Sequence, residues 1–261
     1  MKQLDGKTAI ILGASAKGNL GQTLAKRFLS EGANVIVSGR REEELAEFSK
    51  ENNCAYKPCD ITKKSDCEAL ASFAQDKYGR IDIAINSTGW GLLVPFLETS
   101  EDDLAKMTAL QFVGPYYFYQ AVIPHMTKGG SIIQISSATA TIMLDNHAAY
   151  MGTKAGTDHV IRCIANEFGE KGIRANSISP GLTDTPMTEG AFAKPEVVAC
   201  FAREYPLGRV GTKEDIANAA IWLSQDGCFM TGQNLQVNGG LTLRRNPRAY
   251  EISEAFMASG S

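Results

Sequence analysis

The stretch "ILGASAKGNLGQTLAKRF", residues 11–28, joins an apolar run to an amphipathic one through a glycine-rich turn. The apolar run, residues 8–12, has the length and β-branched content of a buried strand, whereas Leu20, Leu24 and Phe28 share one face of a helix. Free backbone amides in such a turn, at the positive end of the helix, attract phosphate. A glycine-rich turn alone is equally compatible with a plain connection. The stretch therefore predicts the first strand and helix of an α/β sheet and raises the hypothesis of a nucleotide site.

The rest of the chain repeats this alternation of short and long runs. Further strand-like runs lie at residues 34–38, 81–85, 131–135, 175–179 and 234–237, with amphipathic segments between them. Strands that alternate with helices predict a parallel sheet covered on both faces, here a Rossmann-like, doubly wound α/β fold in a single domain. We expect the domain to span residues 1–243, with residues 244–261 as a C-terminal tail, and ligands to bind at the carboxyl ends of the strands.

Composition and charge exclude several classes of function. The 261 residues include 26 Lys and Arg against 29 Asp and Glu, a net charge of −3, without the basic block that nucleic-acid binding requires. Neither an apolar run of about 20 residues nor a signal-peptide pattern is present, which predicts a cytoplasmic protein without a membrane partner. The six cysteines form no CxxC pair, so we expect reduced thiols and no metal site.

The cofactor hypothesis depends on residues in the turn and after the second strand. The turn residues expected to meet a dinucleotide are Gly13, Ser15, Lys17, Asn19 and Leu20.

The second predicted strand ends in "SGRR", residues 38–41. A carboxylate at this point favours NAD by accepting a hydrogen bond from the ribose 2′-hydroxyl, but Gly39 stands there. Arg40 and Arg41 follow, and a guanidinium suits a 2′-phosphate through charge-assisted bonds. Either arginine alone is equally typical of solvated surface. Together with the missing carboxylate, they predict NADP(H) rather than NAD(H).

A phenol and an ammonium stand four residues apart in "YMGTK", where Tyr150 and Lys154 fall on one face of a helix. A nearby cation favours the phenolate, so we expect Lys154 to lower the pKa of Tyr150. Ser137, after the strand at 131–135, is a candidate to orient a carbonyl. On spacing alone, surface packing is the better explanation of the pair.

These motifs together resemble the short-chain dehydrogenase/reductase family, over about Leu4 to Leu243. Ser137 precedes Tyr150 by thirteen positions, the usual interval in that family. The matching pieces follow the family order: the glycine turn at 13–21, "CDI" at 59–61, "NSTG" at 86–89, "ISS" at 135–137, "YMGTK" at 150–154, "NSISPGLTDTPM" at 176–187 and "TGQNLQVNGG" at 231–240.

The resemblance implies hydride transfer between a nicotinamide and a carbonyl carbon. Tyr150 would exchange the proton, Ser137 would polarise the carbonyl, and Lys154 would bind the ribose and tune the phenol. The resemblance also assigns cofactor contacts to Asp60, Ile61, Asn86, Leu182, Thr183 and Thr185.

Two departures from the family pattern bear on this assignment. The glycine turn is two residues longer than the common form, and Asn19 replaces its middle glycine; asparagine tolerates a left-handed backbone, which would preserve the turn. Gln111 stands where many relatives carry an asparagine of a water-linked proton relay. The longer side chain either supports a modified relay or simply packs.

The predicted substrate pocket is apolar. Trp90, Met143, Leu144 and Met187 are candidates to line it, although packing accounts for each one equally well. They predict a bulky ketone or secondary alcohol, steroid-like, cyclic or 3-oxoacyl. The family also implies a homotetramer, with the tail either capping a neighbour's pocket or disordered.

Two other functions compete with a carbonyl reductase or alcohol dehydrogenase. One is a dinucleotide-binding sensor or scaffold whose chemistry has lapsed. The other is an enoyl reductase on the same fold, although those relatives space tyrosine and lysine more widely than "YMGTK" does.

Overall fold

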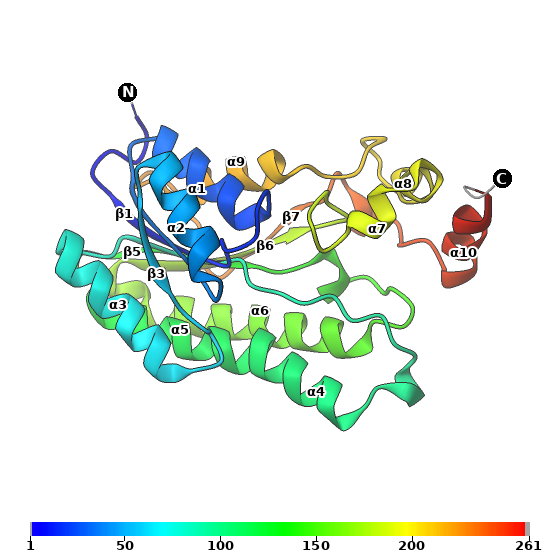
Figure 1. The fold of residues 1–261 in the computed structure, drawn as a ribbon, viewed down its shortest axis with the longest axis horizontal. Helices are drawn as coiled ribbons and strands as arrows, with labels where there is room; N and C mark the ends of the chain where they lie inside the picture. Colours follow the sequence, from blue (N-terminus) through cyan, green and yellow to red (C-terminus); the bar gives the residue numbers. More distant parts are fainter. Residues whose placement is uncertain (1, 259–261) are drawn as a thin grey trace.

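A parallel sheet forms the centre of the computed structural model, which describes residues 2–258 (Figure 1). Its strands run in the order β3-β2-β1-β4-β5-β6-β7, so the chain reverses direction across the sheet between β1 and β4. This doubly wound order confirms the predicted fold class and places a ligand crevice beyond the carboxyl ends of β1 and β4. The strands are β1 Thr8–Leu12, β2 Asn34–Gly39, β3 Ala55–Pro58, β4 Ile83–Asn86, β5 Gly130–Ile135, β6 Ile173–Pro180 and β7 Asn234–Val237.

Helices cover both faces of the sheet. In Figure 1, α1, α2 and α9 lie on one side, and α3, α5 and α6 on the other, while α7, α8 and α10 gather at one end. The helices are α1 Leu20–Ser30, α2 Glu42–Asn52, α3 Lys64–Tyr78, α4 Glu101–Thr108, α5 Gly114–Val122, α6 Ala148–Phe168, α7 Glu189–Phe192, α8 Pro195–Ala202, α9 Lys213–Ser224 and α10 Ala249–Ala258. A π-helical turn, Ala109–Val113, joins α4 to α5.

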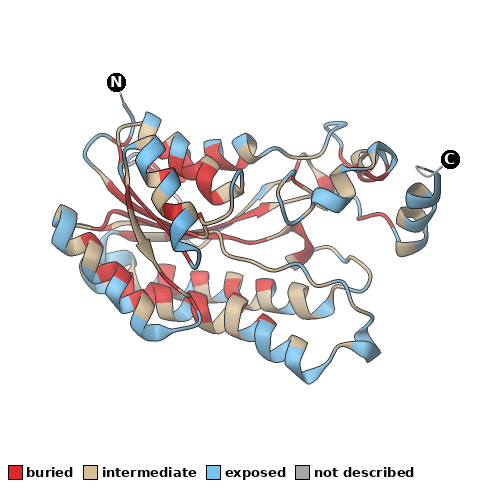
Figure 2. Cartoon of the chain, in the orientation of Figure 1, coloured by how far each residue is buried: buried red, intermediate tan, exposed pale blue. Residues whose placement is uncertain are grey.

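Alternate strand residues enter two separate cores. Ile11 packs with Leu24 and Phe28 of α1, whereas its neighbour Ile10 packs with helix residues on the opposite face, such as Leu70 of α3. Both faces are therefore buried, which explains why these strands are apolar throughout rather than alternating (Figure 2).

The structure adds one strand that sequence patterning missed. The edge strand β3, "AYKP", pairs with β2 from Ile36 to Gly39 but is four residues long and only partly buried. A short edge strand that contains lysine and ends in proline lacks the apolar signature of a central strand.

The C-terminal tail forms a helix that packs on its own chain. Ile252 and Ala255 of α10 contact an apolar cluster that includes Val197 and Phe201 of α8. The disorder considered for this tail is therefore wrong for residues 249–258, while residues 259–261 lie outside those described. Among the described residues, no helix has the length and apolar character needed to cross a membrane.

The packing of α1 predicts a large effect of truncating Leu24, which is fully buried against the sheet. Leu24→Ala should lower the free energy of unfolding by about 2–5 kcal/mol, because it removes buried methyl groups and leaves a cavity. Urea denaturation measures the change. Leu97→Ala, at a position 94% exposed, is the matched control and should stay within about 0.5 kcal/mol of wild type; equal losses in both variants would contradict the packing of α1.

Candidate active site

A cleft of ≈ 680 Å³ opens at the carboxyl ends of the strands. Its wall comes from the turn after β1, the ends of β2 and β5, the start of α6 and the loop after β6. Residues singled out from the sequence that line this cleft are Gly13, Ser15, Asn19, Leu20, Arg40, Arg41, Asp60, Ile61, Ser137, Tyr150, Lys154, Thr183, Thr185 and Met187.

Other candidates from the sequence do not line this cleft. Asn86 is fully buried behind it, where its amide donates to Gln134 Oε1 and its oxygen accepts from Thr88. Leu182 packs in the apolar cluster beside α8. The remaining residues outside the wall are Lys17, Trp90, Met143 and Leu144.

In the glycine turn, the left-handed backbone conformation falls on a different residue from the one predicted. Asn19 is extended, with φ −76° and ψ 173°, so the prediction of a left-handed Asn19 is wrong. Gly18 takes the positive φ of +70° instead. Asn19 is the N-cap of α1, since its Oδ1 accepts from Gln22 N at 3.0 Å and its Nδ2 donates to Gly13 O at 2.7 Å. The left-handed position and the cap therefore fall on two adjacent residues, Gly18 and Asn19.

The end of β2 leaves little room for an acidic side chain. A Cβ at Gly39 would lie 2.6 Å from Ser15 Oγ, so a carboxylate there requires the turn to shift. Arg41 is engaged on the surface, 3.3 Å from Glu44. Arg40 is exposed at the cleft and makes no ion pair within residues 2–258. Both arginines line the cleft, and Arg40 is the one without an ion pair among the described residues.

Arg40 also influences the carboxylate expected near the adenine. Burial raises the pKa of Asp60, but hydrogen bonds from Thr62 and the charge of Arg40 more than offset this and leave it below its usual value. Asp60 Oδ1 accepts from Thr62 N at 3.1 Å and from Thr62 Oγ1 at 2.8 Å, which fixes the loop after β3. An ionised, oriented Asp60 can accept hydrogen bonds from a ligand in the cleft.

Ser137, Tyr150 and Lys154 meet at one point of the cleft wall. Ser137 follows β5, and its hydroxyl lies 2.9 Å from Thr139 Oγ1. Tyr150 and Lys154 occupy consecutive turns of α6, with Lys154 Nζ 5.6 Å from the centre of the phenol ring. Lys154 is 3% exposed and donates to the backbone oxygen of Ile135 at 2.8 Å. The fold thus brings a hydroxyl, a phenol and an ammonium together from two elements.

The pKa of the phenol shifts opposite to the sequence-based expectation. Burial raises the pKa of Tyr150 to about 12, although the Ser137 hydroxyl opposes the change. Burial also lowers the pKa of Lys154 to about 8, against the attraction of Asp158. The expectation that Lys154 makes Tyr150 acidic is therefore wrong for the protein alone, because burial of the phenol dominates its pKa.

Asp158 is a partly buried carboxylate that the sequence analysis did not single out. It lies one turn beyond Lys154 on α6, and its Oδ2 accepts from Ser136 Oγ at 2.8 Å and from Asn234 Nδ2 at 2.7 Å. These bonds tie α6 to the start of β7 and to Ser136, which follows β5 and precedes Ser137. The signal was present in the sequence, since Asp158 follows Lys154 at the spacing of helical neighbours.

Gln111 contacts the helix that carries Tyr150 and Lys154. It is 2% exposed within the π-helical turn, and its Nε2 donates to Thr153 Oγ1 at 3.1 Å. Its Oε1 is buried and accepts no hydrogen bond from the described residues. A Cβ at Gly89 would lie 3.4 Å from this oxygen and 3.9 Å from Lys154 Nζ. Gln111 thus packs against α6 and also presents a free acceptor near the ammonium.

The loop after β6 is connected to α8 through one tyrosine. The backbone N–H of Leu182 donates to Tyr205 Oη at 2.6 Å, and Tyr205 is 2% exposed. A Cβ at Gly181 would lie 2.1 Å from the same oxygen, so the absence of a side chain at 181 permits the bond. The loop that bears Thr183 and Thr185 is therefore held by the segment that follows α8.

The doubly wound sheet and this cleft together define a nicotinamide-dependent oxidoreductase. A family model described as enoyl-(acyl carrier protein) reductase matches residues 13–242. The chain belongs to the short-chain dehydrogenase/reductase family, which confirms the resemblance.

Relatives and solved structures agree with this membership. The chain is 34% identical to 3β-hydroxysteroid dehydrogenase 1 of Eggerthella lenta, over 92% of this chain and 95% of the relative. It is 35% identical to 7α-hydroxysteroid dehydrogenase of Escherichia coli, over 91% and 95%. A gluconate 5-dehydrogenase from Burkholderia cenocepacia, solved with NADP and tartrate, matches with a TM-score of 0.88 and 26% identity, covering 92% of this chain and 97% of that one.

The lowered pKa of Lys154 predicts a stability that depends on pH. The folded protein releases this proton near pH 8, whereas an unfolded lysine holds it to about 10.5. Between these values the unfolded state binds more protons, so the fold gains up to about 1.4 kcal/mol per pH unit from this group. Urea denaturation of wild type and Lys154→Met at pH 7.5, 8.5 and 9.5 should show wild type gaining stability relative to the variant. A difference independent of pH would contradict the burial of the ammonium.

Proposed function

We propose that the protein is an NADP(H)-dependent oxidoreductase that interconverts a ketone and a secondary alcohol. The observation that carries the proposal is the meeting of Ser137, Tyr150 and Lys154 in the wall of a cleft built at the switch point of the sheet. A bound nicotinamide supplies the hydride, and the protein supplies position, electrostatics and the proton.

Tyr150 is the proton donor in the reduction. Because burial raises the pKa of Tyr150 to about 12, the phenol is protonated at neutral pH and can give its proton to the oxygen that gains charge. The Ser137 hydroxyl donates a hydrogen bond to the same oxygen, which stabilises charge as it develops. Tyr150 and Ser137 together hold the carbonyl group in place while its carbon receives the hydride.

Lys154 helps to replace the proton that Tyr150 gives to the substrate. Its pKa of about 8 lies close to neutrality, so the ammonium can release and regain a proton during turnover. While charged, it stabilises a phenolate formed on Tyr150. Asp158 favours the charged form of Lys154 and is a positioning residue through its bonds to Ser136 and Asn234.

The choice of NADP(H) rests on the end of β2. Gly39 has no room for a carboxylate without a shift of Ser15, and Arg40 is exposed at the cleft without an ion pair among the described residues. The residues present therefore fit a ribose that carries a 2′-phosphate. The gluconate dehydrogenase solved with NADP is a structural neighbour with the same fold.

The proposed substrate is a bulky apolar carbonyl or alcohol. Met187 lines the cleft and is 54% exposed, and a Cβ at Gly91 would lie 3.5 Å from its sulfur, so an apolar side chain stands at the mouth of the cleft. Two relatives named as hydroxysteroid dehydrogenases act on substrates of this class, whereas the gluconate dehydrogenase is named for a small polar one. The apolar mouth favours the former class.

We also propose a homotetramer in the cytoplasm, as the family resemblance implies. Leu104 on α4 and Tyr116 on α5 are 49% and 47% exposed, and such side chains suit an interface between subunits.

Reduction of an enoyl thioester is the second candidate, favoured by the description of the matching family model. Ketone reduction remains our proposal, because Tyr150 and Lys154 lie on adjacent turns of α6 with Ser137 beside them in the cleft wall. A trans-2-enoyl thioester assayed beside a ketone separates the two reactions.

Removing the phenolic hydroxyl tests the chemistry. Tyr150→Phe should lower kcat for reduction of trans-1-decalone by about 10²–10⁴-fold, because the proton donor is lost while the ring remains. NADPH binding, followed by fluorescence titration, should stay unchanged. Tyr78→Phe, at the end of α3 and outside the cleft, is the matched control and should keep wild-type turnover. Wild-type turnover in Tyr150→Phe would refute the assigned role.

Removing one guanidinium tests the cofactor preference. Arg40→Ala should lower the ratio of kcat/KM for NADPH to that for NADH by about 10–100-fold, the usual effect of losing a hydrogen bond to a charged group. Arg41→Ala, whose side chain pairs with Glu44, should change the ratio less. An unchanged ratio in Arg40→Ala would show that another group reads the 2′-phosphate.

A further inference from the structure

His147 lies immediately before α6 and contacts the proton donor of the site. Its imidazole stacks on the phenol of Tyr150, with ring centres 4.2 Å apart and ring planes inclined by 22°. His147 is the N-cap residue of α6, yet within the described residues its side chain makes no capping hydrogen bond. The side chain at this position often accepts from the first helix amides, so the imidazole is used for other contacts.

The imidazole also reaches the loop after β4. Its Nδ1 lies 2.6 Å from the backbone oxygen of Leu92. A carbonyl oxygen only accepts hydrogen bonds, so Nδ1 carries the hydrogen and donates it. Burial lowers the pKa of His147 below its ordinary value, against the effect of this hydrogen bond. The ring is therefore neutral at pH 7, and it covers the phenol without placing a second cation beside it.

A second hydrogen bond joins the same two segments. The backbone N–H of Val94 donates to the backbone oxygen of Asn146 at 2.7 Å. Asn146 has a positive φ of 60°, a left-handed conformation that asparagine tolerates, and this turn leads the chain into His147. The loop after β4 begins in the wall of the cleft, at residues 87–89. His147 thus connects that loop to Tyr150.

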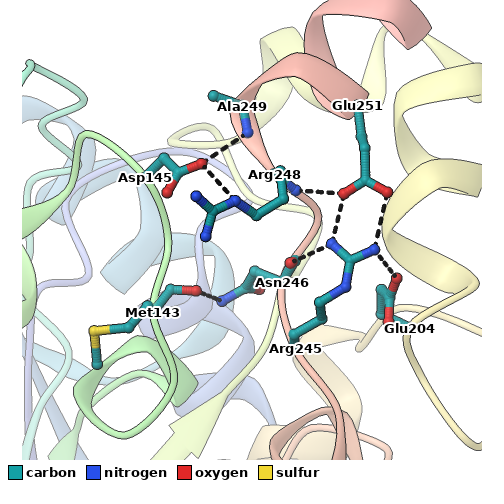
Figure 3. Close-up of polar contacts among 8 residues, drawn as sticks. All are labelled: Met143, Asp145, Glu204, Arg245, Asn246, Arg248, Ala249 and Glu251. Atoms are coloured by element: carbon teal, nitrogen blue, oxygen red, sulfur yellow. Dashed lines mark hydrogen bonds and ion pairs between the residues drawn. The ribbon is translucent and has the colours of Figure 1, made fainter.

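The segment that precedes His147 is held by the C-terminal tail (Figure 3). Asn246 donates from Nδ2 to the backbone oxygen of Met143 at 3.1 Å. Asp145 Oδ2 accepts from the backbone N–H of Ala249 at 3.0 Å. These bonds hold the backbone on one side of His147, and α6 holds it on the other side. A substitution of the imidazole therefore changes its own contacts without releasing the chain.

The phenol of Tyr150 requires a contact that limits its tilt. Two bonds of the tyrosine side chain rotate, and Tyr150 is partly exposed at the cleft. A tilt moves the phenol oxygen relative to the carbonyl that it must protonate, and a misplacement of about 1 Å can slow a reaction about 100-fold. Stacking of two aromatic rings favours one arrangement by about 2–10-fold. The imidazole face thus restrains the group that must be oriented for reaction.

We propose that His147 is a positioning residue, which holds Tyr150 in the orientation for proton transfer and joins it to the loop after β4. This inference rests on the proposed function. The ring face orients the phenol, and the Nδ1–H fixes the loop that continues from the cleft wall. Because the two contacts use different parts of one side chain, substitutions can remove them one at a time.

The first test observes the phenol without any substrate. In the full-length protein labelled with 3-fluorotyrosine, the fluorine resonance of Tyr150 is the one that Tyr150→Phe removes. His147→Asn replaces the ring by an amide that can still donate to Leu92, and it should move this resonance because no ring stacks on the phenol. His159→Asn, at an exposed histidine of the same helix, is the matched control and should leave the resonance at its wild-type position.

The second test separates the two contacts by kinetics and hydrogen exchange. With trans-1-decalone and NADPH, kcat should fall about fivefold in His147→Asn and recover in His147→Phe, which restores a stacking ring, while NADPH binding stays within about twofold of wild type. Hydrogen exchange in a peptide covering 88–95 should show the reverse order. It should be about fivefold faster in His147→Phe, which lacks the donor, and closer to wild type in His147→Asn. A merely structural role of His147 would change both measurements together.

Each part of the proposal has a result that would overturn it. An unmoved Tyr150 resonance in His147→Asn would overturn the stacking contact, and a moved resonance with wild-type kcat would overturn the role in proton transfer. Wild-type exchange of residues 88–95 in His147→Phe would overturn the connection to the loop. A wild type that does not reduce the ketone with NADPH would overturn the proposed function and the role in proton transfer, while the resonance and the exchange would still decide the two contacts.

Discussion

The buried ammonium of Lys154 is the constraint on which the rest of the site depends. A charge that is 3% exposed is costly to bury, so the surrounding structure must offset the loss of water. The Ile135 carbonyl accepts a hydrogen bond from Nζ, and Asp158, one turn along α6, supplies the opposite charge. Because Ile135 ends β5 and Asp158 bonds to Ser136, the requirements of one ammonium fix the end of β5 against α6. Ser137 and Tyr150 take their relative positions from that contact.

Much of the fold could be predicted from the sequence because the strands and helices follow from the pattern of apolar residues. The reacting groups could be predicted from the order and spacing of the motifs that carry them. The strands at 8–12 and 234–237 have the predicted bounds, and the doubly wound sheet confirms the fold class. Strand β3 could not be predicted from its apolar content, since it is a short edge strand whose identity comes from pairing with β2. The spacing within "YMGTK" predicted the pair on α6, and the structure adds that Lys154 is buried while Tyr150 is partly exposed at the cleft.

The predictions that were wrong concern effects that depend on three-dimensional surroundings. The pKa of Tyr150 moves up because of burial, which the spacing of two residues does not reveal and which outweighs the hydrogen bond of the Ser137 hydroxyl. Asn19 is a helix cap because Gly18, one residue earlier, already provides the left-handed turn. The tail is a helix because Asp145, about a hundred positions earlier, accepts from its first amide. In each case the outcome depends on which residues lie close together in space, and the sequence alone does not show this.

The bond between Leu182 N and Tyr205 Oη has a consequence for how the two sides of the cleft move. Gly181 permits the close contact with Tyr205, and a second hydrogen bond, from Gly211 N to Leu182 O at 3.1 Å, joins the loop 181–185 to the segment after α8. Displacement of either one strains both bonds, so the loop and the segment are mechanically coupled. A ligand that orders the loop 181–185 therefore also restrains the segment after α8.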